Sequence, residues 1–150
     1  MTDRSLILPI TCGGAIIAHL QDSFPEEGCG LIVGHETGDG WLVTEIVPSP
    51  NQAEARERTF EIDPGLRLRT QRTARERGDA VLGHYHSHPY GDLVPSETDT
   101  RRAADEPELL WVVVGMRWGG TQGLAAWQRK AGSGTMKRVM VDVIEGAGQS

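Results

Sequence analysis

At 150 residues the chain has the length of one domain that buries a core of its own, with no length left for a second. The formal net charge of −6 excludes a general nucleic-acid binder, which needs a basic surface to neutralise phosphates. The domain is expected to span residues 1–145, followed by a flexible C-terminal tail at residues 146–150 that is small and polar.

The two cysteines, Cys12 and Cys29, are too few for the disulfide framework of a small secreted domain. A reducing, cytoplasmic location is therefore expected. No run of the sequence approaches the roughly 20 apolar residues that a transmembrane helix needs. Membrane binding is therefore not expected either.

Hydrophobic periodicity and helix-boundary residues predict three helices. They are expected at residues 9–23, 64–77 and 96–105. Phe24-Pro25 should end the first helix, and Asp63 should cap the second, in which Pro64 suits the first turn.

Strands are predicted where short apolar or β-branched runs lie between turn residues. These runs are residues 28–35, 41–47, 59–62, 80–85, 109–115, 123–129 and 136–144. Six or so strands with three helices between them indicate an α/β (α+β) fold, a mixed β-sandwich flanked by helices rather than a regular doubly wound sheet.

The most informative motif is a pair of histidines, His86 and His88, followed eleven residues later by Asp99. Alternate side chains of an extended strand share a face, so both histidines can point at one ion. Pro89 restricts His88 to extended backbone angles and so fixes its direction. Two imidazoles and a carboxylate are ligands that Zn²⁺ accepts, and a set of three leaves one tetrahedral position open for water. We expect one catalytic zinc ion here.

Two further residues have both a structural and a catalytic interpretation. Ser96 opens a Ser-x-x-Asp pattern typical of a helix N-cap, and a serine there can also donate to an oxyanion. Glu27 follows another glutamate and, taken alone, is more typical of a solvated surface. Its selection as a catalytic residue depends on a family pattern.

These residues resemble the JAMM motif of the MPN zinc metalloproteases, in the bacterial stand-alone form of that family. The motif consists of a distant glutamate, then His-x-His-Pro, and then Ser-x-x-Asp after seven residues that include the proline. Residues 27–34 (EGCGLIVG) and 83–89 (GHYHSHP) are similar to two family segments, and the first of them selects Glu27 over Glu26. Residues 60–64 (FEIDP) are similar to the bacterial members. The resemblance covers about residues 6–145.

The resemblance implies the MPN/cytidine-deaminase-like fold and a zinc ion bound by His86, His88 and Asp99. It implies that Glu27 takes a proton from water and passes it to the leaving amine, while Ser96 steadies the oxyanion. Family enzymes cut the bond after the C-terminal glycine of a ubiquitin-like protein. The implied function is a zinc-dependent isopeptidase or peptidase (hydrolase) with a ubiquitin-like or sulfur-carrier protein as its substrate and partner.

Two features depart from this pattern or lie outside it. His84 stands where the family carries an apolar or aromatic residue, and a role beside the metal ligands or at the surface is expected for it. Five arginines crowd the second helix and form either a solvated face or a docking surface for an acidic partner. These are Arg67, Arg69, Arg72, Arg75 and Arg77.

Three alternatives remain open at this stage. The same zinc chemistry suits an enzyme that releases an amino acid such as cysteine from a sulfur carrier. A non-catalytic MPN scaffold is a second possibility, although this chain keeps every residue of the motif. A non-haem iron oxygenase also uses two histidines and a carboxylate, but it gives no role to Glu27 or Ser96. The oligomeric state is not indicated by the sequence.

Overall fold

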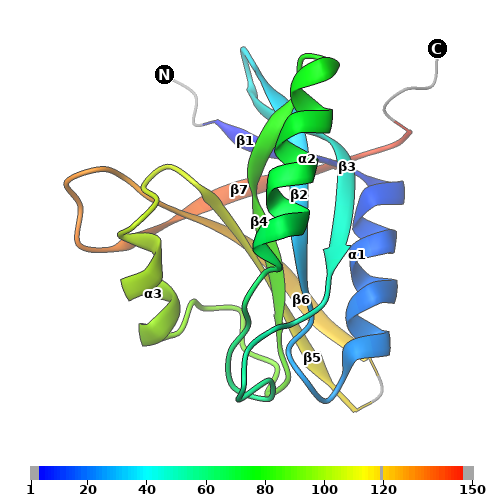
Figure 1. Cartoon of the computed structure of the whole chain (residues 1–150), viewed down its shortest axis with the longest axis vertical. Coiled ribbons are helices and arrows are strands. Elements are labelled where there is room, and N and C mark those ends of the chain that lie inside the picture. Colours follow the sequence, from blue (N-terminus) through cyan, green and yellow to red (C-terminus); the bar gives the residue numbers. More distant parts are fainter. Residues whose placement is uncertain (1–3, 119, 147–150) are drawn as a thin grey trace.

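The computed structural model describes residues 4–118 and 120–146. Seven strands and three helices are formed by these residues (Figure 1). In chain order the elements are β1 Ser5–Pro9, α1 Ile10–Ser23, β2 Cys29–Thr37, β3 Gly40–Ser49, α2 Pro64–Glu76, β4 Ala80–His88, α3 Glu97–Ala103, β5 Leu110–Arg117, β6 Gly120–Arg129 and β7 Met136–Ile144. The mixed α/β class with flanking helices is confirmed.

The strands form one closed sheet in the order β1-β3-β2-β4-β5-β6-β7. The first strand closes it, because β1 pairs in parallel with both β3 and β7. Strand β1 was not predicted from the sequence, and the joining of the two layers of the expected sandwich by this strand was not predicted either. β4 lies in the middle, antiparallel to β2 and parallel to β5. The strand that carries the two histidines is therefore hydrogen-bonded on both sides.

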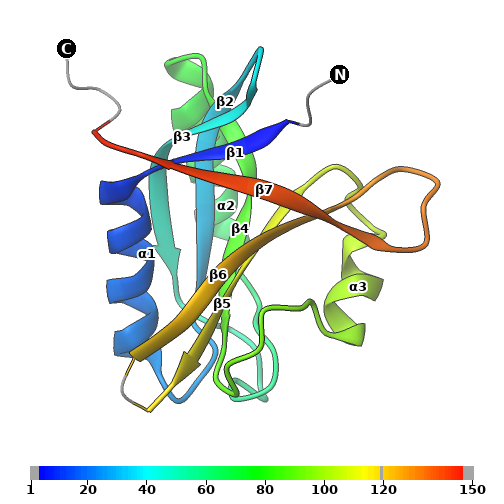
Figure 2. The same cartoon turned by 180° about the vertical axis from the view of Figure 1, so that it is seen from behind.

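The two faces of this sheet have different packing partners. Helix α1 runs beside β3 (Figure 1), and its Ile16 and Leu20 enter the main core, which also holds Tyr85 of β4. Helix α2 lies over β2 and β4 on the opposite face. When the molecule is viewed from behind, β6 and β7 lie in front of α2 (Figure 2). Because side chains alternate along a strand, Tyr85 and the neighbouring histidines point to opposite faces.

A second, smaller apolar cluster forms on the face of the histidines. It consists of Cys29, Phe60, Ala103 and Trp111, all fully or almost fully buried. Phe60 comes from the loop before α2, and Ala103 comes from α3. This cluster therefore joins two segments of the chain to the centre of the sheet, at the place where the metal ligands were predicted.

Local signals predicted most element bounds well. Helix α2 begins at Pro64 with Asp63 as its N-cap, whose side chain accepts a hydrogen bond from the Gly65 amide at 2.9 Å. The short strand expected at residues 59–62 is not formed, and only an isolated bridge joins Asn51 to Ile62. Apart from Gly146, the predicted C-terminal tail lies outside the described residues. Among those residues, none of the helices is long and apolar enough to cross a membrane.

Candidate metal centre

The three predicted ligands converge in the interior of the protein. His86 Nε2 lies 3.0 Å from His88 Nε2, and Asp99 Oδ2 lies 3.2 Å from each of these nitrogens. All three side chains are buried. Ligand atoms about 2.0–2.1 Å from a tetrahedral zinc ion are separated by about 3.3 Å, so this triangle has the size that zinc requires. The donor set and its geometry both fit the ion that the sequence predicts.

Helix α3 presents Asp99 to the histidines through its capping box. The Asp99 amide donates to Ser96 Oγ at 3.0 Å, and the Ser96 amide donates back to Asp99 Oδ2 at 2.9 Å. Burial raises the pKa of Asp99, but its contacts with the His86 and His88 rings and the hydrogen bond from the Ser96 amide outweigh this effect and hold the pKa well below its usual value. Asp99 is therefore an anion at neutral pH.

The Ser96 hydroxyl hydrogen is not used in this capping box, because Ser96 Oγ acts there only as an acceptor. Ser96 is also exposed to solvent. Both interpretations of Ser96 in the sequence are thus compatible, since a helix cap and a donor toward substrate use different parts of one hydroxyl group.

A carboxylate that the sequence analysis overlooked orients His88. Asp92 Oδ1 accepts a hydrogen bond from His88 Nδ1 at 2.8 Å. Because a carboxylate is only an acceptor, the hydrogen lies on Nδ1 and the lone pair of Nε2 faces Asp99 and His86. Burial lowers the pKa of His88, but its contacts with Asp99 and Asp92 reverse the direction and raise it. The spacing His-x-x-x-Asp was the only available signal for Asp92.

Glu27 is buried beside this group, with 3 % of its surface exposed. Burial raises the pKa of Glu27 to about 8, and the nearby charges of His88 and Asp99 then act in opposite directions. The solvated surface position that the sequence around Glu27 favours is therefore excluded. The buried carboxyl group lies close enough to the histidine and aspartate cluster to sense their charges.

Three backbone contacts hold Glu27 at this place. The Glu27 amide donates to the Arg56 carbonyl at 2.7 Å, and the Glu27 carbonyl accepts from Asn51 Nδ2 at 2.8 Å. The next amide, that of Gly28, donates to Ser87 Oγ at 2.9 Å. Because Ser87 lies between His86 and His88, the start of β2 is tied directly to the segment that carries the histidines.

Aromatic side chains pack against His86 and against the neighbouring His84. Phe60 stacks on His86 with ring centroids 4.3 Å apart, and Trp111 contacts the His84 ring edge-on at 4.2 Å. His84 is not at the surface, because only 7 % of it is exposed. It also lies outside the group of three convergent ligands. Its pKa is lowered well below the usual value by burial, with the positive charges of His86, Arg102 and Arg67 acting in the same direction.

The arginines of α2 do not form one uniform face. Arg67 makes a two-pronged ion pair with Glu106, and Arg77 pairs with Asp79 and Glu45. The other three, Arg69, Arg72 and Arg75, are exposed. The docking surface for an acidic partner stays a prediction.

A buried carboxylate beside a His-His-Asp group is the side-chain set of a hydrolase. The family model of prokaryotic homologs of the JAB domain matches residues 12–130, and the chain belongs to this family. The resemblance to the JAMM/MPN proteins is thereby confirmed.

Characterised relatives agree with this assignment. A desampylase from Haloferax volcanii is 33% identical over 108 residues, which cover 69% of this chain and 76% of the relative. A CysO-cysteine peptidase from Mycobacterium tuberculosis is 30% identical over 112 residues, covering 75% of this chain and 74% of the relative. A solution structure of a protein from Desulfitobacterium hafniense superimposes with a TM-score of 0.81 at 25% identity and covers 94% of both chains. The chain is thus a peptidase.

Proposed function

We propose that this protein is a zinc-dependent isopeptidase or peptidase that hydrolyses the bond after the C-terminal glycine of a ubiquitin-like or sulfur-carrier protein. The observation that carries the proposal is the triangle of His86, His88 and Asp99 with the buried Glu27 beside it. The names of the relatives, a desampylase and a CysO-cysteine peptidase, support substrates of this class.

His86 Nε2, His88 Nε2 and Asp99 Oδ2 would hold the ion. Bound zinc supplies Lewis acidity, which activates water and polarises the scissile carbonyl. Glu27 serves as the general base that takes a proton from the attacking water and passes it to the leaving amine. Its burial suits this role, since a raised pKa brings a carboxyl group closer to the pH at which it must both accept and return a proton. A cation beside Glu27 lowers that pKa again and keeps the base ionised.

Ser96 is assigned the role of donor to the oxygen of the scissile carbonyl. It is exposed, it precedes the ligand Asp99 by three residues, and its hydroxyl hydrogen is free to be donated. A hydrogen bond from this hydroxyl stabilises the negative charge that develops on the oxygen in the transition state.

The glycine tail is expected to pass between two segments near the ligands. One leads to Phe60, and the other is the loop from Tyr90 to Val94, whose end residues are half exposed. The two segments touch where the Tyr90 hydroxyl donates to the Glu57 carbonyl at 3.4 Å. A tail that lacks side chains suits a narrow passage, with recognition through its backbone.

A matched set of variants tests the assignment of roles. Glu27→Ala should abolish hydrolysis and keep zinc, with a rate loss of about 10²–10⁴-fold, because it removes a base and not a ligand. His88→Ala should lose both zinc and activity. Glu26→Ala is the control, since the Glu26 side chain is only partly buried and pairs with Arg56. Zinc content by elemental analysis and hydrolysis of a glycine-terminated conjugate are measured together. Loss of zinc from Glu27→Ala would contradict the proposal.

A second function is favoured by one comparison. The relative named CysO-cysteine peptidase supports release of cysteine from a carrier as the alternative to cleavage of protein conjugates. Both reactions use the same residues and differ in the leaving amine. Parallel assays of one carrier, joined either to cysteine or to a lysine side chain, distinguish them by kcat/KM. A non-catalytic scaffold predicts that neither substrate is cleaved. The cytoplasmic location stays a prediction.

A further inference from the structure

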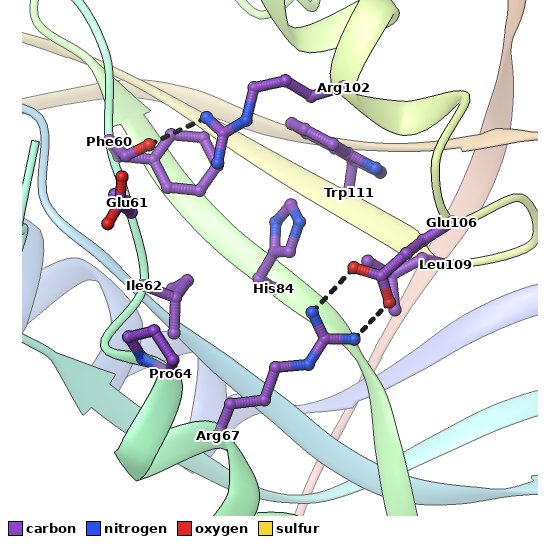
Figure 3. A pocket seen from close by; sticks show the side chains of 10 residues that line it. All are labelled: Phe60, Glu61, Ile62, Pro64, Arg67, His84, Arg102, Glu106, Leu109 and Trp111. Atoms are coloured by element: carbon purple, nitrogen blue, oxygen red, sulfur yellow. Dashed lines mark hydrogen bonds and ion pairs between the residues drawn. The ribbon is translucent and has the colours of Figure 1, made fainter.

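Phe60, whose ring stacks on the predicted ligand His86, also lines a pocket (Figure 3). This pocket has a volume of about 190 Å³, room for more than one water molecule. Phe60, His84 and Trp111 form its aromatic wall, while Arg67 and Arg102 reach into it from α2 and α3. The ring of Phe60 therefore separates this pocket from the candidate metal centre. Its centroid lies 4.3 Å from that of the His86 ring and 5.3 Å from that of the His84 ring.

Two residues that line the pocket carry polar atoms whose hydrogen-bonding capacity is unused. His84 Nδ1 and Trp111 Nε1 are buried and have no hydrogen-bond partner among the described residues. Such groups are uncommon in folded proteins, because a buried donor without a partner has lost its hydrogen bonds to water without replacement. His84 also differs from the apolar or aromatic residue that the resemblance to the JAMM family implies at this position. A histidine at this position therefore points to a ligand that the pocket is built to receive.

The charged groups of the pocket indicate the chemistry of that ligand. Arg67 is occupied, because Glu106 binds its guanidinium with both carboxylate oxygens. Arg102 uses one nitrogen to donate to the Phe60 carbonyl at 2.8 Å, and its guanidinium lies over the Phe60 ring. Its other N–H groups make no hydrogen bond within the described residues. The remaining acidic side chain of the lining, Glu61, is exposed at the edge. The inner part of the pocket thus offers donors and positive charge.

We propose that this pocket is a specificity subsite that binds an acidic side chain of the substrate's C-terminal tail, two residues before the glycine whose carbonyl is attacked. The inference rests on the proposed function. Its position follows from spacing, because His84 precedes His86 by two residues of an extended strand, a distance of about 6.6 Å. An extended tail with its last carbonyl at the ligands covers the same distance in two residues. A carboxylate there accepts from Arg102, whereas an arginine meets like charge.

Short synthetic tails test the subsite. Each ends in Xaa-Gly-Gly joined to a fluorescent amine, with Xaa as Glu, Ala, Leu or Arg. The zinc-loaded enzyme should prefer Glu over Ala by about tenfold in kcat/KM, as expected for a charge-assisted hydrogen bond, and should cleave the Arg tail most slowly. Moving Glu one residue further from the terminus is the substrate control, since that side chain points to the opposite face. Equal rates for Glu and Ala, or a preference for Leu, would overturn the subsite.

Variants of α3 identify the group that is responsible. Arg102→Met should reduce the Glu-to-Ala ratio to near one, and Arg102→Lys should restore part of it. Arg101→Met is the matched control, because Arg101 is exposed and pairs with Glu97 on the same helix. The ratio is informative even if Arg102→Met lowers both rates. Two enzymes combined with two substrates form a double-mutant cycle, which isolates the coupling between Arg102 and the substrate side chain. A ratio that survives in Arg102→Met contradicts the proposal.

A binding measurement separates failure of the subsite from failure of the proposed function. Calorimetry with the zinc-free protein and free tails ending in Glu-Gly-Gly or Ala-Gly-Gly should show tighter binding of the Glu tail. If no tail is hydrolysed but this difference in affinity is observed and disappears in Arg102→Met, the subsite stands and the peptidase proposal fails. If tails are hydrolysed without any difference in rate or affinity, the subsite fails and the peptidase proposal stands.

Discussion

The ring of Phe60 lies stacked on the imidazole of His86, with centroids 4.3 Å apart and an angle of 20° between the planes. Phe60 is 1% exposed. Its ring also contacts Trp111, and the guanidinium of Arg102 lies over it. A residue in the loop before α2 thereby fixes the orientation of a predicted metal ligand in the centre of the sheet. It also forms the partition between the candidate metal centre and the pocket.

Phe60→Ala is expected to destabilise the protein by about 3–5 kcal/mol, since it empties a buried aromatic site. It should also weaken zinc binding, because His86 loses the ring that holds its orientation. Urea unfolding and a competitive zinc titration measure the two effects. Phe60→Leu is the control that keeps most of the buried volume without the flat stacking surface. Unchanged zinc affinity in both variants would show that Phe60 does not orient His86.

Asp92→Ala is expected to weaken zinc binding by about 10- to 100-fold, because His88 loses the acceptor that fixes its tautomer and ring orientation. Asp105→Ala is the control, since Asp105 is exposed and lies just beyond α3. Zinc affinity is measured in competition with a chelating dye. If both variants bind zinc as the unchanged protein does, the hydrogen bond from His88 to Asp92 has no role in holding the ion.

Glu27→Gln is expected to stabilise the zinc-free protein at neutral pH. Burial raises the pKa of Glu27 to about 8, against an ordinary value of 4.5. Between these values the folded state keeps a proton that the unfolded state has lost, so the stability of the unchanged protein falls as the pH rises through this window. The cost at pH 7 is on the order of 3 kcal/mol.

Thermal unfolding in the presence of a chelator, from pH 5 to 8, measures this effect. The gain in Tm for Glu27→Gln should grow as the pH rises, and by more than any change seen for the control Glu26→Gln, whose side chain is only partly buried. A gain that does not change with pH would mean that the glutamate is already ionised in the folded state.

Two glycines should respond to alanine in opposite directions. A Cβ at Gly14, in α1, meets no atom within 4 Å, so Gly14→Ala should stabilise the protein by about 0.5–1 kcal/mol. A Cβ at Gly83 would lie 2.0 Å from the Leu110 carbonyl oxygen, so Gly83→Ala must push β4 away from β5 and should be strongly destabilising. The free energy of unfolding in urea measures both. Similar effects of the two substitutions would contradict this packing.

The narrow passage predicts a strong dependence on the end of the substrate. Replacing the terminal glycine of a ubiquitin-like substrate by a bulky residue should lower kcat/KM far more than changing the substrate's globular surface. Paired kinetics of tail and surface variants of one substrate measure this difference. Equal or greater sensitivity to the surface variants would reject recognition through the tail.

Local chemistry was enough to predict most of the secondary structure. Asp63 before Pro64 predicted the start of α2, and the run from Met136 to Ile144 matched β7, because capping and β-branched runs act within a few residues. The strand β1 was not predicted. It is short, and its partners β3 and β7 lie far along the chain, so no local pattern specifies the pairing that closes the sheet.

The candidate site likewise contains residues that local sequence predicts and residues that depend on distant contacts. Strand alternation predicted that His86 and His88 would share a direction, and the helix cap of Ser96 predicted the placement of Asp99, since both effects depend on neighbouring residues. Glu27 could be selected only by resemblance, because its burial beside His88 depends on a contact between distant segments, in which the Gly28 amide binds Ser87, 59 residues further along the chain.

The contacts that tune the site arise in the folded chain alone. Ser87 ties the histidine segment to β2, Asp92 orients His88, and Phe60 covers His86 from a loop far away in the sequence. Sequence periodicity reports which residues share a face, but the partner across that face depends on how distant segments pack together. This is why the convergence of His86, His88 and Asp99 could be predicted from the sequence, whereas the contacts that support these residues and the pocket beside Phe60 required the folded structure.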